Sequence, residues 1–237
     1  MKKNMLEKQK GISATLNALE KSKEEKKPYA VVFFGKKFIV LPGVFSPKYF
    51  DDAKFFGYHL PIIVERKSLL EVGLGTGILS VLCALNGAKV SGVDLNPTAL
   101  ENTKQNAKLH KCFIDARAGD LFSLFKAEEK FDFIFWNHPF GWVSKEPTDI
   151  LEKAVFDKGY RSLKRFFEGA KKHLLPNGKV LLGTSSLASI TEIKKLAKKA
   201  GYGIKLLAKS EKEFVESKIP IDLRIYELLP IAIPKKC

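Results

Sequence analysis

The chain has 237 residues, 45% of them hydrophobic, which is enough for one well-buried α/β domain with a short extension. Its apolar runs are strand-sized, shorter than the roughly 20 residues that span a bilayer, and its basic N-terminus lacks a signal peptide's apolar core. Cys83, Cys112 and Cys237 have no metal-ligand or disulfide spacing, so a cytoplasmic protein without metal or membrane partner is expected. The net charge of +15 suits a polyanionic partner, but a lysine-rich solvated surface explains it equally well.

The first 45 residues are predicted to form an extension to the main domain. A polar, lysine-rich helix with a weak apolar stripe is expected over 5–27. Apolar runs at 30–34 and 38–41, separated by a glycine turn, predict a hairpin. The turn-rich segment 41–47 follows, and we expect it at the surface of a pocket. Residues 46–237 are expected to form the main domain.

From residue 68 onward, strand and helix patterns alternate. Buried strands are expected at 68–72, 89–93, 112–116, 131–136 and 179–183, with helices near 77–86, 97–109, 159–174 and 188–200. This alternation indicates an α/β fold with a mostly parallel sheet, right-handed crossovers and helices on both faces. The last two apolar runs, about 203–209 and 223–231, have no helical pattern between them. They are therefore expected to pair antiparallel at the sheet edge.

A glycine-rich turn joins the first of these strands to its helix, in Glu71-Val72-Gly73-Leu74-Gly75-Thr76-Gly77. Glycines there let a ligand approach the backbone closely, and the helix N-terminus adds free amides. A dinucleotide fingerprint needs glycine or alanine at the next position, where the chain has Ile78. The spacing therefore disfavours NAD and FAD, while a tight turn without any ligand is the plain alternative.

Two carboxylates follow the next strands of the sheet. Asp94 ends the second strand, where a carboxylate can accept both hydroxyls of a ribose. Its alternative is a helix-terminal residue beside the cap and first-turn proline of Asn96-Pro97. Asp120, after the third strand, can accept a hydrogen bond from an adenine amine, or it is a loop carboxylate in water.

The tetrad Asn137-His138-Pro139-Phe140 ends the apolar run 131–136. The Asn137 side-chain oxygen and the His138 carbonyl can accept both N–H groups of a planar amine, which favours the pyramidal geometry that frees its lone pair. Pro139 restricts His138 to an extended backbone, and Phe140 can stack on the planar group. The tetrad therefore predicts a pocket for N-methylation, against the alternative of a simple turn after a strand.

These motifs together resemble the motif series of the class I S-adenosylmethionine-dependent methyltransferases, over about residues 40–237. The resemblance implies a Rossmann-like sheet in the order 3-2-1-4-5-7-6 with the seventh strand antiparallel. It implies a catalytic set formed by the tetrad. It also implies that S-adenosylmethionine is bound by Glu71, Gly73, Gly75, Thr76, Gly77, Asp94, Leu95, Asp120, Leu121 and Asn137. The chain departs from the amino-methylating subgroup at His138, where proline is usual. Because this position acts through its backbone carbonyl, histidine is chemically permissible, and the alternatives are that it contacts substrate or marks a divergent or weakened site.

The segment 41–47 resembles a stretch found in small-domain methyltransferases that act on guanine amines of ribosomal RNA or on glutamines of release factors. Basic pairs such as Lys171-Lys172 and Lys194-Lys195 favour RNA, and the release-factor enzymes usually carry a larger N-terminal helical domain. The sequence therefore predicts methylation of an exocyclic base amine in RNA, with ribosomal RNA first. Protein glutamine methylation is the alternative, a small-molecule amine ranks third, and a binding module without turnover is the competing class. The oligomeric state is not predicted.

Overall fold

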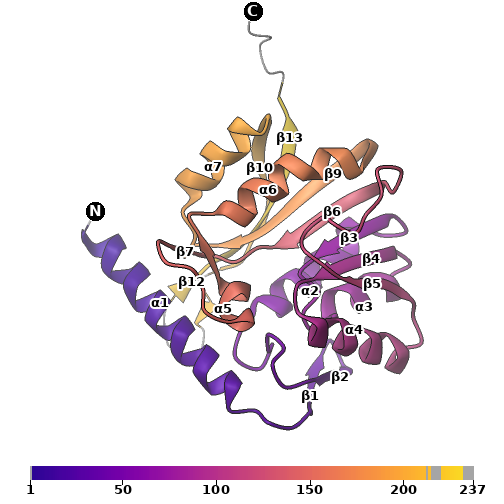
Figure 1. Cartoon of the computed structure of the whole chain (residues 1–237), viewed down its shortest axis with the longest axis horizontal. Coiled ribbons are helices and arrows are strands. Elements are labelled where there is room, and N and C mark those ends of the chain that lie inside the picture. Colours follow the sequence, from indigo (N-terminus) through magenta and orange to yellow (C-terminus); the bar gives the residue numbers. More distant parts are fainter. Residues whose placement is uncertain (1, 212, 215–219, 232–237) are drawn as a thin grey trace, which may run out of the picture.

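Seven strands form one sheet in a computed structural model that describes residues 2–211, 213–214 and 220–231. For residues 2–9, 213–214 and 220 only the backbone is described. The strand order is β10-β13-β9-β6-β3-β4-β5 (Figure 1). The strands are β3 (Ser68–Val72), β4 (Lys89–Asp94), β5 (Ile114–Ala118), β6 (Phe131–Asn137), β9 (Leu174–Ser185), β10 (Tyr202–Lys209) and β13 (Leu223–Pro230).

The predicted order and direction of the strands are confirmed. β13 runs antiparallel to both of its neighbours, β9 and β10, while the pairs among β5, β4, β3, β6 and β9 are parallel. The last strand therefore inserts between β9 and β10, and β10 forms the edge. This matches the order expected from the methyltransferase resemblance.

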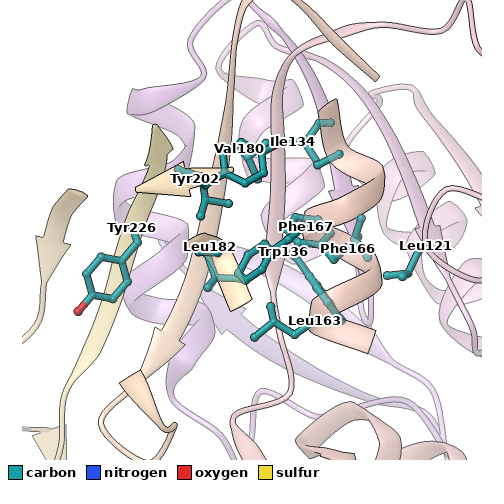
Figure 2. Close-up of a cluster of buried hydrophobic side chains, with 14 of the residues drawn as sticks. Leu121, Ile134, Trp136, Leu163, Phe166, Phe167, Val180, Leu182, Tyr202 and Tyr226 are labelled. Atoms are coloured by element: carbon teal, nitrogen blue, oxygen red, sulfur yellow. The ribbon is translucent and has the colours of Figure 1, made fainter. Parts of the chain in front are cut away.

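Helices cover both faces of the sheet, because the strands alternate their apolar side chains between two cores. In β6, Ile134 and Trp136 face α6 (Arg161–Ala170) and α7 (Ile190–Lys199), while Phe135 faces the opposite core. That second core receives α2 (Asp52–Ile63), α3 (Ile78–Leu85) and α4 (Pro97–Leu109). Figure 2 shows the first core, in which Trp136, Leu163 and Phe166 lie where α6 packs on the sheet.

Several element boundaries differ from the prediction. The helix expected over 159–174 is shortened to α6, followed by one 3-10 turn (Lys171–His173), and the strand expected at 112–116 lies two residues later as β5. The elements α2, β7 (Gly141–Val143), α5 (Ile150–Val155) and β8 (Phe156–Lys158) were not predicted. In α2, Gly57 and Pro61 interrupt the helical pattern of the sequence, and the buried side chains of Phe55, Phe56 and Leu60 stabilise the helix instead.

The N-terminal hairpin, β1 (Tyr29–Phe33) and β2 (Lys36–Val40), is attached to α4 by two buried asparagines. Asn106 accepts the Ile39 N–H at 2.8 Å and donates to the carbonyls of Ile39 and Thr76, each at 2.8 Å. Asn102 accepts the Leu41 N–H and donates to the Ile39 carbonyl. The division of the chain at residue 45 stays a prediction, but the hairpin shares its core with α2 and α3.

Helix α1 (Lys2–Lys23) lies beside α5 (Figure 1). Leu19 packs against Leu151, Val155 and Phe156, and Lys23 forms a 2.8 Å ion pair with Asp149. The predicted helix therefore exists, but it ends at Lys23, before residue 27. None of the described helices combines the length and apolar character that a membrane span needs.

Replacing Asn106 by alanine is expected to lower the free energy of unfolding by about 2–4 kcal/mol, because it leaves buried backbone groups of Ile39 and Thr76 without partners. Denaturant unfolding measures the loss. Gln105→Ala, at the preceding and exposed position of α4, is the control and should change stability by less than about 0.5 kcal/mol. Equal effects of both changes would contradict the proposed attachment of the hairpin.

Candidate active site

Parallel strands bring the glycine turn and the tetrad to the same edge of the sheet. Val72 of β3 is in register with Trp136 of β6 and with Val93 of β4. Gly73, Asn137 and Asp94 therefore leave three adjacent strands at one level. A cavity of about 1610 Å³ lies there, lined by these three residues and closed by parts of α1, α5 and the segment 45–52.

The glycine turn presents backbone to the cavity through its first two glycines. Gly73 and Gly75 both line the cavity and have positive φ angles of 74° and 53°. The position that a Gly75 Cβ would occupy is open space. The third glycine, Gly77, lies outside the cavity wall as the N-cap of α3, where a Cβ would meet Thr103 at 2.8 Å. It allows α3 and α4 to pack closely, whereas Gly73 and Gly75 face the space available to a ligand.

Asp94 fixes the geometry of two loops with its carboxylate. One oxygen accepts the Gly75 N–H and the other accepts the Asn96 N–H, both at 2.8 Å. Asn96 in turn caps α4 by accepting the Thr98 N–H at 3.0 Å. Burial raises the pKa of Asp94 above its usual value. Asp94 therefore lies next to the helix cap and also lines the cavity, with Leu95 beside it, and its contact with a ribose stays a prediction.

Two members of the expected cofactor set lie behind the cavity wall. Glu71 is buried, accepts a hydrogen bond from the Ser80 hydroxyl, and has its pKa raised to about 8, mainly by burial. Thr76 is also buried, and its carbonyl accepts the Asn106 amide. Both residues lie beneath the glycine turn. The backbone of the turn faces the cavity, whereas the side chains of Glu71 and Thr76 do not line it.

The third-strand motif contributes Asp120 and Leu121 to the cavity wall. Asp120 lines the cavity and forms a 2.8 Å ion pair with Arg165 of α6, and its side chain is 40% exposed. Leu121 is buried and has a positive φ of 51°, which turns the chain back beneath the cavity. Arg165 was not identified from the sequence.

Asn137 has one satisfied and one unsatisfied side-chain atom. Its Nδ2 donates to Asp52 Oδ2 at 2.5 Å, whereas Oδ1 is buried and has no hydrogen-bond partner. Asp52 lies in the first turn of α2, lines the same cavity, and has its pKa raised to about 6 by burial. A buried amide oxygen without a partner is uncommon in folded proteins and marks a place where a donor can be accepted.

His138, the residue that departs from the family pattern, is packed into the protein. Its ring is almost fully buried, and Nε2 lies 2.9 Å from Thr184 Oγ1. Burial lowers the pKa of His138 to about 3, so the imidazole is neutral. The ring makes edge contacts with Trp136, Phe140 and Tyr160. The side chain thus fills a core position.

Tyr160 secures the end of the tetrad. Its hydroxyl donates to the Phe140 carbonyl at 2.8 Å and accepts the Ser189 N–H at 3.0 Å. Phe140 is partly buried at the cavity, and Trp142 is half exposed on the same wall. The sequence did not identify Tyr160 or Asp52, because both act through contacts between segments distant in the chain.

These groups match what S-adenosylmethionine requires. The open backbone of Gly73 and Gly75 can pass the methionine part, Asp94 is at the strand end suited to a ribose, and Leu95 and Leu121 add apolar side chains to the wall. Within the part of the chain that the structure describes, no three His, Cys, Asp or Glu side chains group as metal ligands.

The sheet order, the glycine turn and the tetrad define an S-adenosylmethionine-dependent methyltransferase of the class I fold. The model of the methyltransferase small domain matches residues 35–212, and the chain belongs to this family. It is similar to a proposed protein N5-glutamine methyltransferase of Methanocaldococcus jannaschii, with 34% identity over 187 residues that cover 77% of this chain and 92% of the relative.

A second relative and one solved structure are also similar to this chain. The release factor glutamine methyltransferase of Aquifex aeolicus is 32% identical over 62% of this chain, which spans 57% of that protein. Among solved structures, a Thermus thermophilus 16S rRNA N2 guanine methyltransferase with S-adenosylmethionine and guanosine has a TM-score of 0.62 at 18% identity. That match covers 84% of this chain and 50% of the other, and it shows a shared fold.

Replacing Asp94 by alanine is expected to raise the dissociation constant for S-adenosylmethionine by roughly 10–100-fold, the loss of charge-assisted hydrogen bonds worth about 1.5–3 kcal/mol. Isothermal titration calorimetry measures the change. Asp115→Ala, on edge strand β5 away from the cavity, is the control. An unchanged dissociation constant for Asp94→Ala would remove this residue from the cofactor site.

The buried Glu71 should make stability without cofactor depend on pH. Because its folded pKa of about 8 exceeds the ordinary 4.5, the unfolded chain loses this proton first, and stability falls as pH rises from about 4.5 to 8. Glu71→Gln should therefore be more stable than the unchanged protein at pH 8.5 by about 2–4 kcal/mol, with a smaller difference near pH 5. Urea unfolding at both pH values tests this, with the exposed Glu65→Gln as control. A pH-independent difference would contradict a buried ionisation at Glu71.

Proposed function

We propose that the protein transfers a methyl group from S-adenosylmethionine to the side-chain amide nitrogen of a glutamine in a partner protein. The charge of the cavity wall carries this proposal. Among the described residues, nine acidic side chains line the cavity against six basic ones. The acidic ones are Glu20, Glu24, Asp51, Asp52, Asp94, Asp120, Glu146, Asp157 and Glu192, and the basic ones are Lys10, Lys21, Lys153, Lys158, Arg161 and Arg165.

A cavity wall with more acidic than basic side chains disfavours the approach of a phosphate backbone, despite the overall charge of +15. Three of its basic side chains share two of the carboxylates, and the acidic Glu20, Asp51 and Glu192 pair with lysines outside the wall. Arg161 and Lys158 both pair with Glu146, and Arg165 pairs with Asp120. A neutral glutamine amide on a protein segment enters such a cavity without the electrostatic repulsion that acidic side chains exert on a polyanion.

The lengths of the relatives also support a protein substrate. The release-factor enzymes usually carry a larger N-terminal helical domain, and this favoured RNA over glutamine at the level of sequence. The proposed glutamine methyltransferase of M. jannaschii is matched over 92% of its length, so a protein of that proposed class has nearly the same extent as this chain. The short extension is therefore compatible with the glutamine assignment.

The residues of the tetrad supply the chemistry on the acceptor side. The unpartnered Asn137 Oδ1 and the His138 carbonyl accept the two amide N–H groups, and Phe140 stacks on the amide plane. Bound S-adenosylmethionine supplies an electrophilic methyl group. The chain needs no strong base, because the methylated nitrogen loses its proton readily. Alignment of nitrogen and methyl is worth up to ~7–11 kcal/mol in favourable cases.

An exocyclic amine of RNA is the second candidate, and two observations favour it. The chain carries 41 lysines and arginines, and α7 presents basic residues in its last turn. The fold is shared with a 16S rRNA guanine methyltransferase. Both acceptors are planar amines, so the same tetrad serves either one.

The substrate is identified by radiolabel transfer. Extract from a strain lacking the protein is incubated with the purified enzyme and methyl-tritiated S-adenosylmethionine, and is then digested with ribonuclease or protease. We expect label that resists ribonuclease and is released by protease, and purified release factors, the substrates named for the relatives, are the first proteins to assay. Label lost with ribonuclease would replace the glutamine proposal by the RNA one.

Asn137→Ala is expected to lower turnover on the labelled acceptor by about 100-fold or more while leaving the affinity for S-adenosylmethionine nearly unchanged, because it removes an acceptor that orients the reacting nitrogen. Label transfer and calorimetry measure the two quantities. Asn86→Ala, at an exposed asparagine away from the cavity, is the matched control. Near-normal turnover of Asn137→Ala would refute the role proposed for the tetrad.

A further inference from the structure

The proposed chemistry depends on which way the amide of Asn137 is turned. The oxygen and nitrogen of an asparagine amide occupy almost the same shape, so hydrogen-bond partners alone decide which atom faces a ligand. Only the oxygen can accept an N–H of the acceptor amine. An amide turned the other way would present its own N–H groups and repel that amine.

Asp52 is the partner that decides this orientation in the structure. An ionised carboxylate has no hydrogen to donate, so it can bind only the nitrogen side of the Asn137 amide. Its Oδ2 accepts Asn137 Nδ2 at 2.5 Å, and its Oδ1 accepts the Ala53 N–H at 3.0 Å. The carboxylate is thus fixed to the first turn of α2, and Asn137 Oδ1 is left buried without a partner.

We propose that Asp52 is a positioning residue for methyl transfer, because its ionised carboxylate holds the Asn137 amide with the oxygen turned toward the acceptor nitrogen. The inference rests on the proposed role of Asn137 but not on the choice between protein and RNA as acceptor. The segment after 41–47 leads into α2 and thereby places the Asp52 carboxylate at the end of β6. The two residues are 85 positions apart in the chain.

The surroundings make this orientation sensitive to pH. Burial raises the pKa of Asp52 to about 6, and Asp51 on the same turn adds repulsion. Other charged groups of the cavity lie on α1 (Glu20, Lys21), after β4 (Asp94) and after β7 (Glu146). Above about pH 6 the carboxylate accepts from Asn137. Below it the protonated acid can donate to Asn137 Oδ1, which occupies the oxygen that the acceptor amine needs.

The test compares Asp52→Asn with the unchanged protein, because an amide at position 52 has the same shape but no longer forces one orientation. We expect kcat to fall about tenfold or more, with the affinity for S-adenosylmethionine changed less than about twofold. Asp52→Glu, which keeps a carboxylate without a hydrogen to donate, should recover part of kcat, whereas Asp52→Ala should not. Asp115→Asn, the same change on β5, is the control and should leave kcat unchanged.

A second readout needs no acceptor substrate. The side-chain amide signals of Asn137 are followed by ¹⁵N NMR between pH 5 and 8 in the complex with S-adenosylhomocysteine, and are assigned by their loss in Asn137→Ala. We expect these signals to titrate with a midpoint near pH 6 in the unchanged protein and in Asp115→Asn, but not in Asp52→Asn. Signals that are insensitive to pH, or that titrate equally in Asp52→Asn, would overturn the inference.

The two proposals fail in distinguishable ways. If Asn137 titrates as expected but neither protein nor RNA accepts label, the proposed function is wrong and the coupling of Asp52 to Asn137 stands. If label is transferred and Asp52→Asn keeps full kcat, the proposed function stands and Asp52 has no positioning role. Melting temperature separates both cases from misfolding, because removal of a buried charge should not lower it at pH 8.

Discussion

The parallel pairing of β3 with β6 is the constraint on which the rest of the site depends. Val72 and Trp136 are in register, so the glycine turn and the tetrad leave the sheet at the same level on adjacent strands. Trp136 also packs its ring into the core under α6, 5.0 Å from the Phe166 ring (Figure 2). A shift of one residue in this pairing would turn Trp136 to the other face and separate Asn137 from Gly73. The glycine turn and the tetrad therefore owe their positions to the same strand pairing.

Local signals at the helix ends allowed α4 to be predicted, and α2, which was missed, lacks them. The bounds of α4 agree with the prediction because Asn96 and Pro97 mark its start. The parallel sheet follows from alternating strands and helices, whereas the order of its strands was implied by the resemblance to the class I methyltransferases. Helix α2 has no such signal, since its hydrophobic pattern contains Gly57 and Pro61 and its stability comes from tertiary packing. A single sequence without contacts cannot reveal that kind of helix.

The candidate site divides in the same way. The strand-end residues Gly73, Asp94 and Asn137 could be predicted, because topology alone places them together. Asp52 and Tyr160 could not, because each acts across a long separation in the chain, on Asn137 and on the Phe140 carbonyl. The net charge does not describe the cavity, since it counts charges over the whole chain, while the described cavity wall has more acidic than basic side chains.

One buried amide links the cofactor turn to the N-terminal hairpin. Asn106 donates to the Thr76 carbonyl in the turn and holds both backbone groups of Ile39 in β2. The turn cannot open far without loosening the hairpin, because Asn106 and Thr76 are buried and these hydrogen bonds would have to break. We therefore expect a ligand that orders the turn to slow hydrogen exchange at the Ile39 amide, more than 30 residues away in the chain. The N-terminal hairpin is thus coupled to the cavity through the hydrogen bonds of Asn106 rather than through contact with the ligand.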